Sequence, residues 1–201
     1  MITLRRYLKK LVQELENIKI DNIEQYESFN LYFFDESRFG TTTIQRRKIT
    51  AKGVKPIGLF QQEFDNTYLY GAFSSITGDH LLYEFSHCNS ECFEAFLKEL
   101  AAANTKELKI IGLDNAPWHK TKTLSVPENI RLIYLPPYSP ELNPAEKVWW
   151  MLKQDMAMRI FKNRNHFITK FYKCINKLTN ESILNLTSYE YLQPIQTIFN
   201  R

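Results

Sequence analysis

The chain has 201 residues, of which 44% are hydrophobic and 14% aromatic, and this composition is typical of a globular protein that buries a substantial core. It excludes an intrinsically disordered chain, and no apolar run approaches the length of a membrane span. The N-terminus lacks an apolar secretory segment. The three cysteines are few, and an odd number cannot all be paired, which argues against a disulfide framework. We therefore expect a protein of the reducing cytoplasm with no membrane partner.

The charges are unevenly distributed along the chain, whose net charge is +4. Residues 1–60 carry 11 basic and 7 acidic side chains, residues 61–155 carry 8 and 13, and residues 156–201 carry 7 and 2. An acidic middle between basic ends suits a metal site with DNA-contacting margins. Lysine-rich, solvated helix faces would give the same distribution, so charge alone does not decide between the two.

The first predicted elements are a helix and a strand. Apolar residues at helical spacing predict an amphipathic helix over residues 3–19, leading into the domain. An apolar run at residues 31–34 predicts a buried strand that ends at Asp35. Residues 38–66 are basic and rich in β-branched side chains, and they predict a hairpin or an extended excursion with a turn at Lys52-Gly53.

A hairpin and a crossover helix are predicted next. Residues 68–76 and 80–85 predict two strands joined by a turn at Thr77-Gly78-Asp79. The helix that follows is expected to be capped by Ser90, and its apolar face carries Phe93, Phe96, Leu97 and Leu100. It leads to a strand at residues 108–113. A right-handed crossover would place this strand parallel to the first one, so that Asp114 comes to lie near Asp35.

The last third of the chain predicts a short strand, a proline-rich loop and several helices. The strand is expected at residues 131–135, and the helix after the loop carries Glu146, Trp149 and Trp150. We expect both tryptophans to pack in the protein rather than stack on bases. A basic helix at residues 165–178, a short helix and an apolar tail complete the chain.

We expect one domain with two flanking segments. Residues 1–30 form a lead-in helix, residues 31–160 form the α/β domain, and residues 161–201 form a helical extension packed on that same domain.

Three motifs carry a family resemblance. They are FFDESRFG from residue 33, DNAPWHK from residue 114 and LPPYSPELNPAEKVWW from residue 135. Together they resemble the catalytic domain of DDE transposases, in the bacterial insertion-sequence branch of the mariner superfamily, over roughly residues 32–153. The resemblance implies a ribonuclease-H-like α/β fold with a mixed five-stranded sheet flanked by helices. It also implies metal-dependent DNA strand cleavage and strand transfer during transposition.

The same resemblance implies a catalytic triad of carboxylates. Asp35, Asp114 and Glu146 would be both the catalytic residues and the ligands of two Mg²⁺ ions, for which Mn²⁺ can substitute. Hard divalent cations take oxygen ligands, which makes carboxylates on rigid elements suitable. Asp35 would bridge both ions, and the other two residues would hold one ion each. The structural alternative is that the two aspartates only cap strand ends.

Residues near the proposed triad and in the basic excursion have predictions of their own. Glu36 should point away from the metals because side chains alternate along a strand, and we expect no catalytic role for it. We expect Asn115 to fix its loop, and His119 to be either a proton carrier or a hydrogen-bonded structural residue. Zinc is not expected near His87, because no second ligand pair has the required spacing. Candidate phosphate contacts in the basic excursion are Arg46, Arg47, Lys48, Lys52 and Lys55.

The implied partners are double-stranded DNA, as transposon ends and target, and a second copy of the chain when assembled on DNA in the bacterial nucleoid. A helix-turn-helix reader needs about three helices, which do not fit before the first strand. We therefore expect weak sequence recognition by this chain, with an upstream helix-turn-helix polypeptide as the missing partner. Two alternatives remain: another ribonuclease-H-like nuclease, and a non-catalytic DNA-binding transposon remnant. The long proline-rich motif opposes the first alternative, and the intact triad opposes the second.

Overall fold

The centre of the protein is a mixed sheet of five strands in the order β3-β2-β1-β4-β5. The computed structural model describes residues 4–47 and 49–199. β1 is antiparallel to β2 and parallel to β4, so this long strand joins an antiparallel meander to a parallel half. The strands are β1 (Ser28–Gly40), β2 (Asn66–Ser74), β3 (His80–Phe85), β4 (Glu107–Leu113) and β5 (Ile130–Tyr134).

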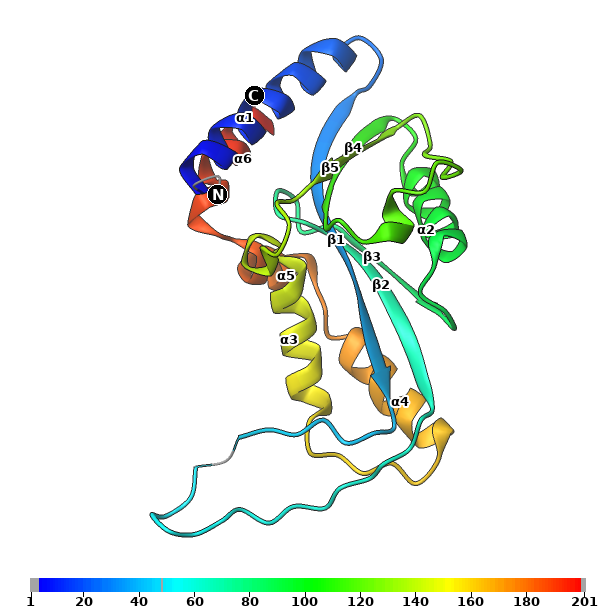
Figure 1. Ribbon diagram of the computed structural model, residues 1–201. Helices are drawn as coiled ribbons and strands as arrows, with labels where there is room; N and C mark the ends of the chain where they lie inside the picture. The colour runs from blue at the N-terminus through cyan, green and yellow to red at the C-terminus, as the bar shows by residue number, and fades with distance from the viewer. Residues whose placement is uncertain (1–3, 48, 200–201) are drawn as a thin grey trace.

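Helices cover both faces of this sheet (Figure 1). α2 lies on one face, whereas the other α-helices pack against the opposite face. No helix among the described residues is both long enough and apolar enough to cross a membrane. The α-helices are α1 (Leu4–Asn22), α2 (Ser90–Ala103), α3 (Ala145–Met156), α4 (Arg164–Ile175), α5 (Asn180–Thr187) and α6 (Gln193–Phe199). Three single-turn 3₁₀ helices are η1 (Pro117–His119), η2 (Pro140–Leu142) and η3 (Glu190–Leu192).

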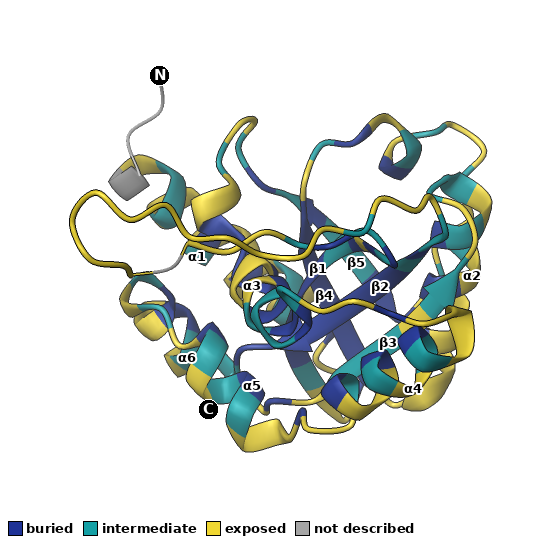
Figure 2. Cartoon of the chain, turned by 90° about the horizontal axis from the view of Figure 1, so that it is seen from below, coloured by how far each residue is buried: buried dark blue, intermediate teal, exposed yellow. Residues whose placement is uncertain are grey.

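Alternation of side chains along β1 divides the core. Phe34 points toward α2 and contacts Phe93 and Phe96, with ring centroids 4.9 and 5.0 Å away. Phe33, on the other face, packs in a cluster with α1 and α6, and Phe39 packs in a cluster with α3, α4 and α5. The sheet is accordingly the most buried part of the molecule (Figure 2). Asp35 therefore lies on the face that carries α3, between two apolar clusters.

β1 is longer than the sequence predicts, and Asp35 lies inside it rather than at its end. Residues from Asp35 to Gly40 continue to pair with β2, where Asp35 lies opposite Gly71. Pairing with β4, in contrast, stops where Phe33 lies opposite Gly112. Asp35 is thus placed where β1 separates from its parallel neighbour. The strand end predicted at Asp35 corresponds to the end of the pairing between β1 and β4, whereas the pairing between β1 and β2 continues to Gly40.

The start of α2 also differs from the prediction. Asn89, not Ser90, is the N-cap, and its side-chain oxygen accepts a hydrogen bond from the backbone N–H of Cys92 at 2.9 Å. Asn and Ser cap helices about equally well, so the sequence does not separate two adjacent candidates. The predicted turn before β3 is present, with Gly78 at a φ of 77°.

Between β1 and β2 the chain leaves the sheet as an extended excursion, residues 41–65, which we call the arm. Near its base the N–H of Thr43 donates to the carbonyl of Gln61 at 2.9 Å. Residues 51–60 are all exposed (Figure 2). The arm reaches well beyond the end of the sheet (Figure 1). The predicted turn occurs at Lys52-Gly53, where Gly53 has a φ of 84°. The described arm residues form neither helix nor strand, as expected for an extended excursion.

Replacing Gly71 with Ala tests how closely α3 must approach the sheet. A Cβ at this position would lie 2.7 Å from the ring of Trp149 and 2.6 Å from the ring of Phe73. Both rings are buried in the core. We expect overpacking to lower the free energy of unfolding by about 1–3 kcal/mol, measured by denaturant titration.

The matched control for this measurement is Gly58→Ala. A Cβ there would meet only the terminal methyl of Met158, at the end of a flexible side chain. We expect a change below about 0.5 kcal/mol for the control. Equal stability of Gly71→Ala and the unaltered protein would show that α3 does not depend on this close approach.

Candidate active site

Asp35, Asp114 and Glu146 line a single cavity of about 410 Å³. Asp35 is part of β1, Asp114 directly follows β4, and Glu146 lies in the first turn of α3. Since Phe33 and Gly112 are paired, each aspartate lies two positions beyond the same rung of the parallel ladder. The proline-rich loop between β5 and α3 supplies most of the remaining lining: Leu135, Pro136, Pro137, Tyr138, Ser139 and Pro140.

The loop before α3 is tied directly to the backbone next to Asp35. The side-chain amide of Asn143 donates to the carbonyl of Phe34 at 2.9 Å, and its oxygen accepts from the N–H of Ala145 at 3.2 Å. These two bonds fix the start of α3, and therefore Glu146, relative to β1. Asn143 received no role from the sequence, although it lies inside the quoted LPPYSPELNPAE motif.

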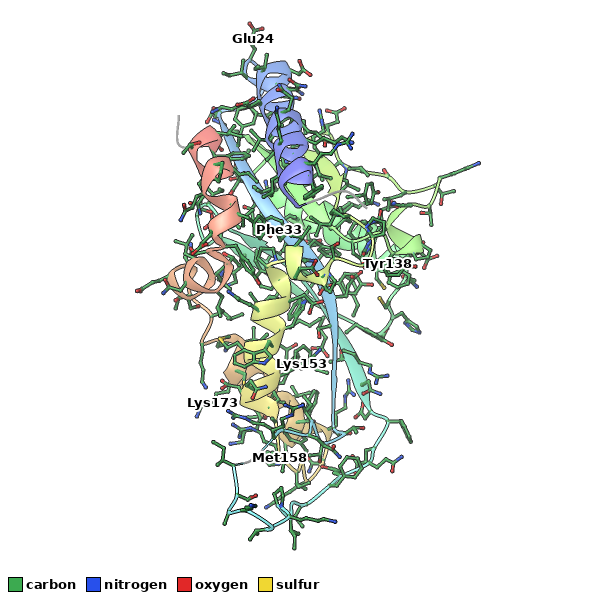
Figure 3. All side chains as sticks on the ribbon, turned by 60° about the vertical axis from the view of Figure 1, so that its left-hand side comes forward. Glu24, Phe33, Tyr138, Lys153, Met158 and Lys173 are labelled. Atoms are coloured by element: carbon green, nitrogen blue, oxygen red, sulfur yellow. The ribbon has the colours of Figure 1, made fainter. Side chains whose placement is uncertain are left out.

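The two tryptophans of α3 behave differently. Trp149 is 1% exposed and packs against Phe73, which confirms the prediction for this residue. Trp150 is 63% exposed, so the prediction that it packs in the protein is wrong. It lies one turn after Glu146, on the same side of the helix. Tyr138, labelled in Figure 3, lines the cavity. It is fully exposed and has a φ of 57°.

Burial and charge act on Asp35 in the same direction. Removal from water raises the pKa of its carboxyl well above the ordinary value, and the negative charges of Glu146, Glu36 and Asp114 raise the pKa further. The desolvated carboxylate has no compensating cation among these neighbours. A divalent ion placed in the cavity would relieve both effects.

A hydrogen-bonded chain connects Asp114 to Glu36 through His119. The Nδ1 atom of His119 lies 2.9 Å from Oδ1 of Asp114, and its Nε2 atom lies 2.9 Å from Oε1 of Glu36. The indole N–H of Trp118 donates to the same Glu36 oxygen at 3.1 Å, and the N–H of Ala116 donates to Oδ1 of Asp114 at 3.0 Å. His119 is thus hydrogen-bonded on both sides of its ring, and whether it carries a proton stays a prediction.

Both ring nitrogens of His119 face carboxylates, and this sets its charge. Burial lowers the pKa of His119, but hydrogen bonds and charge attraction from Asp114 and Glu36 outweigh burial and raise it to about 9. The hydrogen bond from His119 in turn holds the pKa of Asp114 below its ordinary value. The imidazolium form, with an N–H on each nitrogen, therefore suits the site at neutral pH.

Glu36 has a place in the site that the sequence alone did not assign. As expected from strand alternation, it is absent from the cavity lining that contains Asp35. Its side chain is nevertheless 7% exposed and is held by the ring N–H groups of Trp118 and His119. The second ring nitrogen of His119 contacts Asp114. The signal in the sequence was the acidic neighbour of Asp35, and its partners lie more than 80 positions away.

A family profile described as DDE superfamily endonuclease matches residues 30–168, which is more than half of the chain. The chain belongs to this family. A relative in Sinorhizobium fredii (strain NBRC 101917 / NGR234), the uncharacterized protein y4pE/y4sA, is 34% identical over 116 residues. That match covers 57% of this chain and 86% of the relative.

Solved structures of Mos1 transposase are similar to this DDE domain. The catalytic domain of Mos1 mariner transposase gives a TM-score of 0.55 at 13% identity, covering 98% of this chain and 92% of that one. A pre-cleavage Mos1 transpososome gives a TM-score of 0.62 at 13% identity, and the match covers 96% of this chain and 61% of the Mos1 chain. The DDE domain thus spans about 60% of the Mos1 chains in such assemblies. At these identities the likeness concerns the fold, and the predicted ribonuclease-H-like architecture is confirmed.

The donor set of the DDE domain fits a hard divalent cation. Three carboxylates share the cavity, and carboxylate oxygens are what Mg²⁺ and Mn²⁺ bind. Among the described residues, no three Asp, Glu, His or Cys side chains are gathered tightly enough to hold one ion. In proteins Mg²⁺ is typically bound through one or two carboxylates, and water or phosphate oxygens complete its shell.

Asn115 and the arm occupy different places relative to this cavity. Asn115 lines the cavity and donates to the carbonyl of Leu135 at 2.5 Å, which links the ends of β4 and β5. The described candidate phosphate contacts on the arm do not line the cavity. Arg46, Arg47, Lys52 and Lys55 are exposed, and Lys48 lies outside the described residues.

Replacing Asp35 with Asn should stabilise the metal-free domain at neutral pH. Because the folded-state pKa of Asp35 is raised, the folded protein loses stability as pH rises from about 4 through that pKa. Asn cannot ionise, so the variant does not lose this stability. We expect a higher melting temperature than that of the unaltered protein in EDTA at pH 7, and a gap that narrows toward pH 4.

Asp21→Asn, at an exposed position in α1, is the control and should show no comparable gap. A variant Asp35→Asn that is less stable than the unaltered protein at every pH would contradict the expected electrostatic strain.

Proposed function

We propose that this DDE domain is the catalytic domain of a DNA transposase, which cleaves and joins DNA strands with the help of divalent metal ions. The observation that carries the proposal is the sharing of one cavity by carboxylates from β1, the end of β4 and the start of α3. The fold that holds them is similar to the Mos1 catalytic domain over nearly the full length of both chains.

The proposed reaction has two steps. In the first, the oxygen of a water molecule bonds to phosphorus while the bond from phosphorus to the transposon 3′ oxygen breaks, leaving a 3′-hydroxyl and a 5′-phosphate. In the second, that hydroxyl attacks a phosphorus of the target DNA and displaces a target 3′ oxygen. When bound, divalent ions would activate the attacking oxygen and stabilise the leaving one. No covalent enzyme intermediate is needed.

Each carboxylate has a separate task in this proposal. Asp35, on the central strand, would bind both ions, as the resemblance to DDE transposases implies. Asp114 and Glu146 would each hold one ion. Mos1 complexes containing Mg and Mn have been solved, which supports a divalent cofactor; two ions per site is part of our proposal. Asn115 would keep the loop after Asp114 in place.

DNA is the proposed substrate, and a second copy of the chain is the proposed partner. Solved Mos1 assemblies include a paired-end complex with the left transposon end and a strand transfer complex. Here the arm carries exposed basic residues suited to phosphates. The arm also exposes large apolar side chains, which are unfavourable in an isolated monomer and suited to a protein contact: Ile49, Ile57, Leu59, Phe60 and Phe64.

The catalytic assignment predicts that Asp114→Ala and Glu146→Ala abolish Mg²⁺-dependent nicking of duplex DNA while leaving the protein folded. The measurement is single-strand cleavage of a labelled transposon-end duplex, with folding followed by circular dichroism. Asp155→Ala, which removes a carboxylate farther along α3 that bonds Lys177, is the control and should keep its activity. Undiminished cleavage by Asp114→Ala would falsify the assignment, and DNA binding without cleavage by the unaltered chain would favour a non-catalytic remnant.

The arm assignment predicts a change in DNA binding when its four described basic residues are replaced together by Ala. We expect weak, sequence-tolerant binding by the unaltered chain, and a salt dependence that flattens by roughly one unit of slope for each phosphate that the variant no longer neutralises. The measurement is DNA titration at several salt concentrations, with the mass of the complex read by light scattering.

Two chains on paired ends would support the proposed dimer. An unchanged salt slope in the arm variant would place the phosphate contacts elsewhere. Strong preference for transposon ends over scrambled DNA would contradict the expectation of weak sequence recognition.

A further inference from the structure

Asp114 is the carboxylate that secondary structure anchors least. It follows the last residue of β4, and its side chain is 58% exposed. A carboxylate in this position would ordinarily sample several rotamers. Two hydrogen bonds nevertheless hold its Oδ1 atom, from the N–H of Ala116 and from His119. Within the part of the chain that the structure describes, no hydrogen bond or ion pair reaches Oδ2, which leaves this oxygen available to a cation.

We propose that Glu36 is a positioning residue for Asp114 and acts through the buried ring of His119. The inference rests on the metal-dependent function proposed above and adds a residue to its machinery. Glu36 does not line the cavity and is therefore not offered as a ligand. Its effect on the site passes through the two 2.9 Å contacts that His119 makes on opposite sides of its ring.

The ring of His119 is held too tightly to adopt another orientation freely. It is 1% exposed and lies between aromatic neighbours, with the ring centroid of Phe93 at 4.4 Å and that of Phe34 at 5.6 Å. Its backbone carbonyl accepts a hydrogen bond from the hydroxyl of Tyr134 at 2.8 Å. The ring therefore transmits the position of one carboxylate to the other.

Glu36 is fixed in turn by the sheet. It lies in β1 opposite Tyr70 of β2, and the indole N–H of Trp118 holds the same oxygen that His119 contacts. Strand β1 thereby orients two proposed ligands at once: Asp35 directly, and Asp114 through Glu36 and His119. Without the Glu36 carboxylate, Nε2–H would be a buried donor lacking its acceptor, and the ring would lose one of the two hydrogen bonds that fix its tilt toward Asp114.

The test is Mn²⁺ binding by the full chain without DNA, measured by electron paramagnetic resonance titration. Outer partners that orient metal ligands typically contribute about 10- to 100-fold in affinity, so we expect Glu36→Ala to weaken Mn²⁺ binding by about tenfold or more. Glu36→Gln keeps an acceptor oxygen at the same reach and should lose less. Asp114→Ala, which removes the proposed ligand itself, should show the largest loss of Mn²⁺ affinity.

The matched control is Glu84→Ala. Glu84 lies in β3, does not line the cavity and accepts a hydrogen bond from the hydroxyl of Tyr172 at 2.6 Å. Removing the Glu84 carboxylate should leave Mn²⁺ affinity unchanged. Melting curves in EDTA establish that each variant is folded. If Glu36→Ala does not fold, Glu36→Gln decides, and a measurable loss of affinity supports the proposal.

The positioning role would be overturned if folded Glu36→Ala bound Mn²⁺ with wild-type affinity while Asp114→Ala bound it weakly. If Glu36→Ala does not fold, the same result for Glu36→Gln would overturn it. Either outcome would leave the proposed function intact. A wild-type chain that binds no Mn²⁺ would overturn the proposed function and this inference with it.

Discussion

The arrangement of the protein depends on the unequal pairing of strand β1. On one side it pairs with β2 from Tyr32 to Gly40, and on the other it pairs with β4 only as far as Phe33. The backbone beyond that point is held rigidly from one side while the other side opens into the cavity. Because β4 ends at the same level, the chain after it brings Asp114 beside Asp35. α3 then closes the third side through the bonds of Asn143.

The electrostatics of the cavity follow from this arrangement. Asp35 is half-buried on a strand whose neighbours cannot move away, so desolvation and nearby carboxylates both raise its pKa. Asp114 is more exposed and has His119 as a partner, so its pKa moves in the opposite direction. The pKa values of the two aspartates thus shift in opposite directions, because Asp114 has a hydrogen-bonded cation, His119, and Asp35 has none. A divalent ion would bind where the uncompensated charge lies.

The surfaces at the cavity and around it suit the same proposed task. The arm extends from the far end of β1, and its exposed side chains are both basic and apolar. Tyr138, which lines the cavity, and Trp150, one helical turn after Glu146, both have exposed aromatic rings. α3 also presents Lys147 and Lys153, whose ammonium groups lie over the rings of Tyr189 and Phe39 at 4.1 and 5.9 Å. Positive and aromatic groups around an acidic centre are what a nucleic-acid strand could contact.

The sequence by itself determined the family, the order of the elements and the turns, because these depend on local residue types. Apolar runs located the five strands, four of them to within two residues, whereas β1 is longer than its apolar run; glycine located the turns at Gly53 and Gly78, where φ is positive. The DNAPWHK and YSPELNP motifs pointed to Asp114 and Glu146, which line the same cavity in the structure.

Tertiary structure decided what each side chain does beyond its type. Trp149 and Trp150 are adjacent and chemically identical, yet one is buried and the other exposed, since only one side of α3 faces the sheet. Glu36 became part of the site through a partner 83 positions away. No local pattern encodes such a contact, because burial and hydrogen-bond partners arise only when distant segments meet across the sheet.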